Sequence, residues 1–176
     1  ARLFYGIAAA ENLLEYGSDV SNAFAEAPPP KQGFYIRPDK AFHEWWTIHK
    51  KRPPIPHGHM IPILSAMQGH PESPRLWEKH ADAILRELGL TPTIHEPCLY
   101  SGIINGKRLI LMPQVDDFAI AALDSHTADL LLDMLDDKLS IPIKRQGLLD
   151  LYNGIDVLQS RHYVKISCTS FIDKIS

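Results

Sequence analysis

Two adjacent carboxylates, Asp116 and Asp117, stand between the apolar runs 109–112 and 119–123. These flanks predict two short strands that join at the acids. Neighbouring residues of a strand point to opposite faces, so the acids lean apart unless a partner binds at least one of them. Closely spaced carboxylates repel each other, and a divalent cation removes that repulsion. The pair therefore indicates either a metal site or a solvated turn, because Asp is also a common turn residue.

A third carboxylate, Asp19, ends an earlier predicted strand, residues 15–20. In a βαββ arrangement the first and third strands can lie side by side, which brings Asp19 close to Asp116 and Asp117. Converging carboxylate oxygens suit Mg²⁺, the usual metal of two-metal phosphoryl transfer. In that chemistry one ion activates an attacking hydroxyl, and the other neutralises the triphosphate and the leaving group. The three acids therefore predict a centre for phosphoryl transfer.

The elements that would position these acids are helices and short strands. Apolar spacing predicts helices at residues 2–14, 74–88 and 127–139 and the start of another at 170–175. For the helix at 74–88, Ser73 is the predicted N-cap and Gly89 the predicted C-cap. Strands are predicted at 15–20, 98–104, 107–112, 118–121, 141–144, 151–157 and 162–167, with a type I′ turn at Asn105 and Gly106. This order predicts an α+β fold, an antiparallel sheet covered by helices on one face.

Residues 27–62 interrupt this order with an irregular excursion that opens on three prolines. Only residues 34–37 suggest one arm of a hairpin there. Residues 31–52 carry six Lys or Arg against two Asp or Glu, a local charge of +4, whereas the whole chain carries −3. That excess indicates either an edge that touches a polyanion or a merely solvated loop. We expect Trp45 and Trp46 to be packing residues rather than base-stacking platforms.

The composition argues against several classes of protein. The sequence shows no run of eighteen or more apolar residues and no signal-peptide pattern, so we expect an intracellular chain with no membrane partner. Cys98 and Cys168 lie far apart, which argues against a disulfide framework and a zinc site. His57 and His59 have no third ligand at a recognisable spacing, so a metal site is not expected there.

The order of five motifs resembles the reverse transcriptase domain of copia-type (Pseudoviridae) LTR retrotransposon polyproteins. The resemblance covers nearly all of residues 1–176, and its specificity lies in the order and spacing, because each motif alone is weak. The matching segments are Asp19-Val20-Ser21-Asn22-Ala23-Phe24 (family DVxNAF), Gln68-Gly69 with Ser73-Pro74-Arg75-Leu76-Trp77 (YGLKQAPRAW), Glu96-Pro97-Cys98-Leu99-Tyr100 (DPSLF), Val115-Asp116-Asp117 (YVDD) and Gly154-Ile155-Asp156-Val157 (FLGIEV).

The resemblance implies a fragment of polymerase palm and fingers, a DNA/RNA polymerase-like fold within the α+β class. Residues 27–62 would be a fingers-like insertion, and residues 168–176 would begin a truncated thumb element. No start methionine or capping residue precedes the first helix, so we expect an excerpt of something longer.

The resemblance also implies roles at the metal centre. Asp19 and Asp116 would be the main magnesium ligands, with Asp117 close by and the Val20 carbonyl in a further coordination position. Phe24 falls where the family's bulky ring excludes a 2′-hydroxyl and so selects deoxynucleotides, although a core Phe after a strand is the alternative.

Four further residues match nucleotide-contacting positions of the family. Gln68 and Gly69 match a loop that contacts the incoming nucleotide and lets the template backbone approach, since glycine has no Cβ. Arg75, at the start of a helix, would meet phosphate or make a solvent-facing salt bridge. Lys144 corresponds to a lysine near the leaving pyrophosphate.

The implied activity is RNA-directed DNA polymerase, in which a primer 3′-hydroxyl attacks the α-phosphate of a deoxynucleoside triphosphate. Two Mg²⁺ ions would be the cofactors, with Mn²⁺ as a substitute. Implied partners are an RNA or DNA template with its primer, deoxynucleoside triphosphates, and the rest of a polyprotein that includes integrase and RNase H. The implied location is a cytoplasmic virus-like particle or the nucleus.

Departures from the family pattern keep a second function open, an inactive palm remnant that binds nucleic acid or protein. Gln114 stands where the family has tyrosine, Gln68 also replaces a tyrosine, and Ser65 replaces a basic residue. Pro71 and Glu72 replace the family's KQ, so several phosphate-binding charges are missing. A third reading, an RRM-like RNA binder, lacks the exposed aromatic pattern on central strands.

Overall fold

The computed structural model describes residues 2–175. The chain divides into two compact units: unit 1 comprises residues 1–23 and 78–176, and unit 2 comprises residues 24–77. Both units combine helices with antiparallel strands, as the predicted α+β class requires. Across the described residues, no helix has the length and apolar character needed to cross a membrane.

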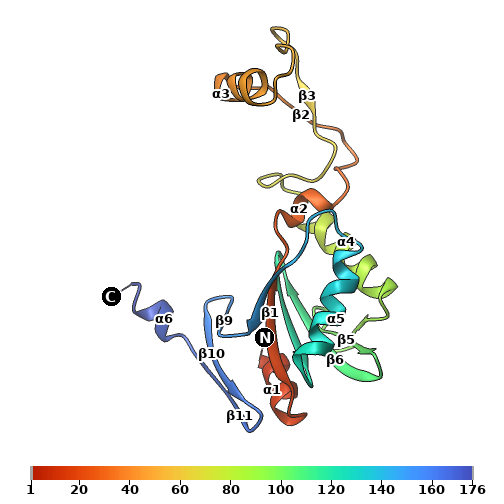
Figure 1. Ribbon diagram of the computed structural model, residues 1–176, viewed down its shortest axis with the longest axis vertical. Coiled ribbons are helices and arrows are strands. Elements are labelled where there is room, and N and C mark those ends of the chain that lie inside the picture. The colour runs from red at the N-terminus through yellow and green to blue at the C-terminus, as the bar shows by residue number, and fades with distance from the viewer. Residues whose placement is uncertain (1, 176) are drawn as a thin grey trace. The chain divides into compact units, whose positions relative to one another are not determined.

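Unit 1 is organised around a six-stranded antiparallel sheet, drawn at its centre in Figure 1. The strand order is β4-β5-β6-β7-β1-β8, so β1 pairs with β7 on one side and with β8 on the other. The strands are β1 (Leu14–Asp19), β4 (Thr91–Pro92), β5 (Tyr100–Ile104), β6 (Lys107–Gln114), β7 (Asp117–Ala122) and β8 (Lys144–Leu148). The topology therefore brings the strand that ends in Asp19 beside the strand that begins at Asp117.

Helices and a smaller sheet complete unit 1. The helices are α1 (Arg2–Ala10), α5 (Ser125–Asp136), α6 (Thr169–Ile172) and the part of α4 (Ser73–Glu87) from residue 78 onward. The smaller sheet is antiparallel in the order β11-β10-β9 and consists of β9 (Leu151–Tyr152), β10 (Ile155–Ser160) and β11 (Tyr163–Ser167). Helix α6 corresponds to the helix expected at 170–175.

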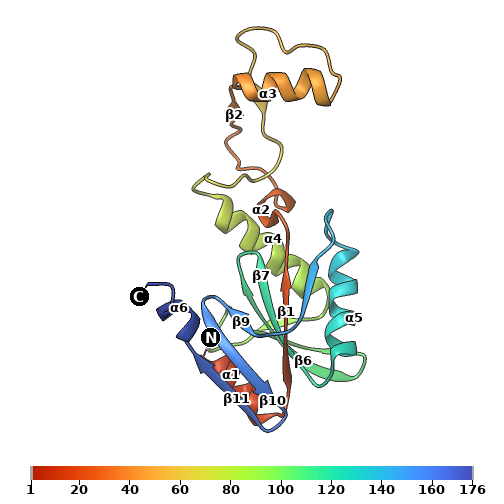
Figure 2. The same cartoon turned by 60° about the vertical axis from the view of Figure 1, so that its left-hand side comes forward.

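Each face of the six-stranded sheet buries its own apolar layer. Alternation along β7 directs Ala119 and Ala121 to the face covered by α1, where Phe4 and Tyr5 are buried. Phe118 points to the opposite face and is also buried. Figure 2 shows α1 and the smaller sheet on one side of β1 and α5 on the other. The prediction of helices on one face is therefore wrong, because α1 covers part of the second face.

Several predicted turns follow from local sequence signals. Asn105 and Gly106 both adopt positive φ, 48° and 73°, as a type I′ turn between β5 and β6 requires. Gly89 ends α4 with a φ of +85°, and the Leu90 N–H donates to the Leu85 carbonyl at 2.9 Å. These elements form where the sequence predicts them because their determinants lie within a few residues.

The strand predicted at 141–144 begins later, because the Ile143 N–H donates to Asp136 Oδ1 at 2.6 Å instead of to a neighbouring strand. The strand predicted at 151–157 is broken by Asn153 and Gly154. Both residues have positive φ, 49° and 76°, and they form the hairpin turn between β9 and β10.

Unit 2 has little buried structure. Its elements are α2 (Ala23–Glu26), which begins at the boundary with unit 1, β2 (Tyr35–Ile36), α3 (Lys40–Glu44), the π-helix η1 (Trp45–His49) and β3 (Ile61–Pro62). Strands β2 and β3 pair antiparallel, which confirms the hairpin arm expected at 34–37. No residue between 31 and 65 is buried, so this hairpin and its helix form without a core of their own.

The helical segment that carries the two tryptophans was not predicted from the sequence. Asp39 caps its start, since Asp39 Oδ1 accepts from the Phe42 N–H at 2.7 Å. Trp45 is 42% exposed and Trp46 is half-buried, so neither ring lies in an interior. As expected, the two rings pack against each other and against Phe42, but they do so outside an interior, because residues 31–65 provide no core.

Candidate active site

The register of β1 and β7 places two of the three predicted carboxylates opposite each other. Asp19, the last residue of β1, pairs with Asp117, the first residue of β7. Directly opposite residues of an antiparallel pair have Cβ atoms about 4.5–5.5 Å apart. The Val20 N–H then donates to the Asp116 carbonyl at 2.6 Å and extends the contact beyond the strand ends. Asp19, Asp116 and Asp117 therefore lie at one end of the sheet.

The third carboxylate lies in a tight turn with an unusual backbone. Gln114 pairs with Asp117, which leaves Val115 and Asp116 as the two turn residues between β6 and β7. Val115 adopts a φ of +54°, which is a genuine outlier for a β-branched side chain. Strained backbone of this kind clusters at active sites and ligand clamps. Asp116 and Gln114 are exposed, whereas Asp117 is half-buried.

The electrostatics of this end of the sheet are those of uncompensated acids. Burial raises the pKa of the Asp117 carboxyl, and the nearby charges of Asp116 and Asp19 raise the pKa further. Within residues 2–175, no Lys, Arg or His forms an ion pair with any of the three carboxylates. The acids therefore repel one another, and no ion pair with a described basic side chain offsets that repulsion.

A lysine flanks Asp19 on its other side. Lys144, the first residue of β8, pairs with Asp19, and a register shift between Gly17 and Ser18 precedes this pair. Such bulges are common next to active sites, where they redirect a side chain. Lys144 is exposed and makes no ion pair with a described residue. Its ammonium group therefore remains available to an anion near the carboxylates.

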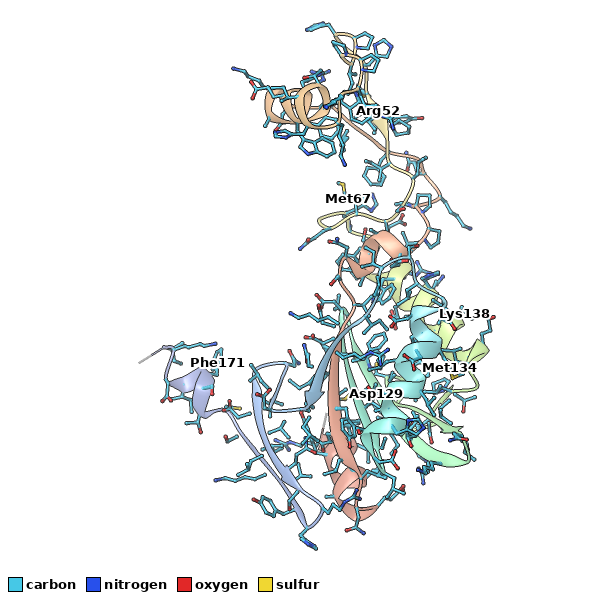
Figure 3. The ribbon with its side chains drawn as sticks, in the orientation of Figure 1. Arg52, Met67, Asp129, Met134, Lys138 and Phe171 are labelled. Carbon is cyan, nitrogen blue, oxygen red and sulfur yellow. The ribbon has the colours of Figure 1, made fainter. Side chains whose placement is uncertain are left out.

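The neighbouring arginine of β8 is used differently. Arg145 bonds to three carboxylates of α5, with nitrogen to oxygen distances of 3.5 Å to Asp129, 2.5 Å to Asp133 and 3.2 Å to Asp136. These contacts hold β8 against α5, the helix that carries Asp129 in Figure 3. The strand that presents Lys144 is therefore anchored by the next residue.

The residues fit Mg²⁺ in ligand type and charge. Carboxylate and carbonyl oxygens are its preferred ligands, and a divalent cation would relieve the repulsion that raises the pKa of Asp117. The side chains of residues 2–175, however, do not bring three or more His, Cys, Asp or Glu groups together as a metal-ligating cluster. The Val20 carbonyl also accepts the Ala23 N–H at 3.2 Å. The site therefore suits Mg²⁺ because the backbone positions of Asp19 and Asp117 face each other and because the three acids are negatively charged. Their side chains do not form a preformed set of metal ligands.

The other predicted site residues belong to unit 2 and are described within that unit. Phe24 is half-buried in α2, and its carbonyl accepts from the Ala27 N–H at 3.1 Å. Gln68 and Gly69 are exposed in a turn, where Gly69 has a φ of +89° that a residue with a side chain rarely adopts. Arg75 is exposed in the first turn of α4, as its predicted phosphate contact requires.

Two residues that tie the smaller sheet to the six-stranded sheet were not identified from the sequence. The Tyr152 hydroxyl donates to the Met112 carbonyl at 2.9 Å and ties the smaller sheet to β6, two residues before Gln114. Burial and the charge of Asp117 raise the pKa of Tyr152, so the hydroxyl keeps its proton. Gln159 likewise bonds to the backbone of Glu15 on β1, at 2.7 Å to the N–H and 2.9 Å to the carbonyl. Neither partnership follows from local sequence, because each joins residues at least forty positions apart.

A comparison with protein-family models finds none that matches the sequence. The likeness to copia-type reverse transcriptases therefore rests on the five motifs alone.

Proposed function

We propose that the chain is an RNA-directed DNA polymerase of the copia retrotransposon type. The observation that carries this proposal is the register of β1, which places Asp19 between Asp117 on β7 and Lys144 on β8. Two acids and a cation at one sheet end suit a reaction in which a polyanionic triphosphate meets a metal-activated hydroxyl. The five motifs, in family order, support the same reaction.

In this proposal the chain's own residues position the reactants. Asp19, Asp116 and Asp117 supply oxygen ligands, and two bound Mg²⁺ ions would lower the pKa of the primer 3′-hydroxyl and neutralise the leaving pyrophosphate. The strained Val115 turn fixes the direction in which Asp116 points, since a tight two-residue turn leaves little freedom. Lys144 places its ammonium beside the triphosphate and adds positive charge where the leaving group departs.

Unit 2 supplies the remaining proposed contacts. Phe24 selects deoxynucleotides, because a ring without hydrogen-bonding groups excludes a 2′-hydroxyl by steric clash. Gln68 and Gly69 contact the nucleotide and template, and Arg75 meets phosphate from the first turn of α4. RNA or DNA template, primer and deoxynucleoside triphosphates are the proposed partners, together with the rest of a retrotransposon polyprotein.

One observation favours a second candidate, a catalytically inactive palm that binds nucleic acid or protein. The carboxylates are not gathered into a ligand cluster within the described residues, and Gln114 stands exposed beside the turn. A palm that had lost its metal centre would keep the sheet and the turn but would need no converging ligands. This candidate predicts binding of template and primer without nucleotide addition.

Primer extension on an RNA template separates the two candidates. The chain is given a labelled primer, Mg²⁺ and deoxynucleoside triphosphates, and is compared with Asp116→Asn and with Asp137→Asn, an exposed carboxylate at the end of α5 that serves as the charge-matched control. Loss of a ligand worth several kcal/mol of transition-state stabilisation predicts a fall on the order of a thousandfold for Asp116→Asn only. Absence of extension by the unaltered chain would reject the polymerase, and equal extension by Asp116→Asn would reject the site.

A further inference from the structure

Unit 2 carries a cluster of aromatic rings outside any core, on α3 and η1, here called the aromatic surface and defined by exposed Trp45 and half-buried Phe42 and Trp46. The three ring centroids lie within 6.5 Å of one another, and the rings of Phe42 and Trp46 stack at an interplanar angle of 19°. Neither α3 nor η1 contains a buried residue. Large rings gathered outside a core indicate a binding surface, because leaving them in water is unfavourable without a partner.

Local hydrogen bonds hold these rings in place without support from a core. The Trp46 indole N–H donates to the Pro53 carbonyl at 2.9 Å, which fixes the plane of that ring. The Thr47 hydroxyl donates to the His43 carbonyl at 2.8 Å, and the Lys50 N–H donates to the Trp45 carbonyl at 3.1 Å. The aromatic surface is therefore preorganised, so a ligand would lose little affinity to ordering the rings.

Two cations lie over the tryptophan rings. Lys50 Nζ is 5.1 Å from the Trp45 ring, and Arg52 Cζ is 5.9 Å from the Trp46 ring. Figure 3 labels Arg52, which lies next to α3. Neither cation forms an ion pair with a described residue, whereas nearby Lys40 pairs with Glu44. The aromatic surface thus offers both flat apolar rings and unneutralised positive charge.

The charge of the whole unit agrees with this local picture. Unit 2 contains seven Lys and Arg against four Asp and Glu, a net charge of +3, in a chain whose net charge is −3. A surface that combines ring faces with excess positive charge is complementary to a polyanion that carries flat bases. Single-stranded nucleic acid has both features, and its bases are free to stack, whereas a duplex hides the faces of its bases.

We propose that the aromatic surface binds single-stranded nucleic acid, with unpaired bases stacked on Trp45 and Trp46 and phosphates paired with Lys50 and Arg52. Stacking on a ring face accepts any base, so binding is tolerant of sequence. The proposal goes beyond the polymerase reaction, because it requires neither the carboxylates of unit 1 nor a metal ion. The proposal gives a role to residues 31–65, which have no core of their own.

Fluorescence anisotropy of a labelled single-stranded RNA, titrated with the full chain in the absence of divalent metal and nucleotide, tests the proposal. The double variant Trp45→Leu, Trp46→Leu keeps apolar area but loses the ring faces. Each stacked base contributes roughly tenfold to the affinity for RNA. Loss of both rings therefore lowers the affinity by about a hundredfold. The double variant Trp45→Phe, Trp46→Phe keeps two ring faces and retains most of the affinity. Circular dichroism melting of all variants stays unchanged, because no residue between 31 and 65 is buried.

The charge component and the controls complete the test. The association constant K for RNA falls with salt concentration, and each phosphate contact to a single strand contributes about 0.7 to the slope of log K against log salt concentration. The double variant Lys50→Gln, Arg52→Gln loses two such contacts, so the magnitude of its slope is lower by about 1.4. Tyr163→Leu, which removes an aromatic ring 51% exposed on unit 1, leaves affinity unchanged. Equal affinity for a duplex, unchanged affinity of the leucine variant, or binding only to proline-rich peptides or anionic vesicles would overturn the proposal. Loss of polymerase activity alone would not affect this result.

Discussion

The two units of the chain hold their functional side chains in different ways. In unit 1, Asp19 and Asp117 are placed by strand pairing in a sheet whose two faces are buried. In unit 2, Trp45 and Trp46 of η1 are placed by hydrogen bonds to residues five to seven positions away in the sequence. A sheet with a core fixes groups that are distant in sequence, whereas a local network positions groups without a core.

The units also differ in charge. Unit 1 contains eleven Lys and Arg against seventeen Asp and Glu, a net charge of −6, whereas unit 2 carries +3. The acidic unit contains the carboxylates proposed to act with metal, and the basic unit contains the cations proposed to meet phosphate. The modest net charge of the chain therefore does not speak against the proposed nucleic acid substrate, because the charges are segregated between the units.

Matched truncations of phenylalanine test the difference in burial most strongly. Phe118→Ala in unit 1 removes a ring that is 1% exposed and is expected to lower the free energy of unfolding by about 3–5 kcal/mol. Phe42→Ala in unit 2 removes a half-buried ring and should cost less than about 1 kcal/mol. Urea denaturation followed by circular dichroism measures both values. Equal costs would mean that unit 2 has a core after all.

A buried acid in β1 makes the stability of unit 1 depend on pH. Glu15 is fully buried, neither of its carboxylate oxygens has a hydrogen-bond partner among the described residues, and burial raises its pKa from 4.5 to about 7. Between these values the folded state keeps a proton that the unfolded state releases, so stability falls as pH rises through this window. At about 1.4 kcal/mol per pKa unit, a shift from 4.5 to about 7 corresponds to a loss of about 3–4 kcal/mol.

Glu15→Gln removes this titration. We expect its free energy of unfolding to change less between pH 5 and pH 8 than that of the unaltered chain, with the larger gain at pH 8. Glu78→Gln, an exposed position of α4, is the matched control and should keep the original pH dependence. Identical pH profiles for the chain and Glu15→Gln would show that Glu15 is not held in its protonated form.

The strained turn gives a smaller effect. Val115→Gly relieves a φ of +54° that costs a β-branched residue on the order of 1–3 kcal/mol, against a cost of roughly 0.5–1 kcal/mol for the flexibility of glycine. We expect the free energy of unfolding to rise by about 1 kcal/mol, measured in urea, and primer extension to slow because Asp116 is held less firmly. A destabilised Val115→Gly would show that the turn is not strained.

The smallest effect concerns the repulsion among the acids. Asp117→Asn removes a charge that burial, and then the neighbouring charges of Asp116 and Asp19, make unfavourable, and these effects raise the pKa of Asp117. Because Asp117 is only half-buried, the expected gain at pH 7 is below about 1 kcal/mol, and it disappears at acid pH, where the carboxyl is protonated in any case. A gain in stability with a loss of extension would identify a functional residue; a loss of both would identify a structural one.

Much of unit 1 could be predicted from the sequence because its signals are local. The Asn105 and Gly106 turn, the Gly89 cap and the apolar stripe of α5 each depend on residues a few positions apart. A βαββ order predicts that Asp19 lies close to Asp117. It does not predict the register of β1 and β7 that places these two residues directly opposite each other. Register is fixed by the packing of whole strands, and a single sequence does not show which strands pair.

What could not be predicted depends on long-range contacts or on their absence. The pairing of Lys144 with Asp19 joins residues that are far apart in sequence, and the resemblance alone suggested a role for Lys144. The exposure of Trp45 could not be read from its type, because Trp is buried on average and only the lack of a core around residues 31–65 exposes it. The positive φ of Val115 contradicts its propensity, so no local signal could have indicated it.

Binding of Mn²⁺, followed by the electron paramagnetic resonance of the free ion, reports on the carboxylates without requiring a template or a primer. We expect that the chain binds Mn²⁺, that Mg²⁺ competes for the site, and that Asp19→Asn weakens binding strongly while Asp137→Asn does not. Mn²⁺ binding that is unchanged in Asp19→Asn would contradict the assignment of a metal centre to the end of β1.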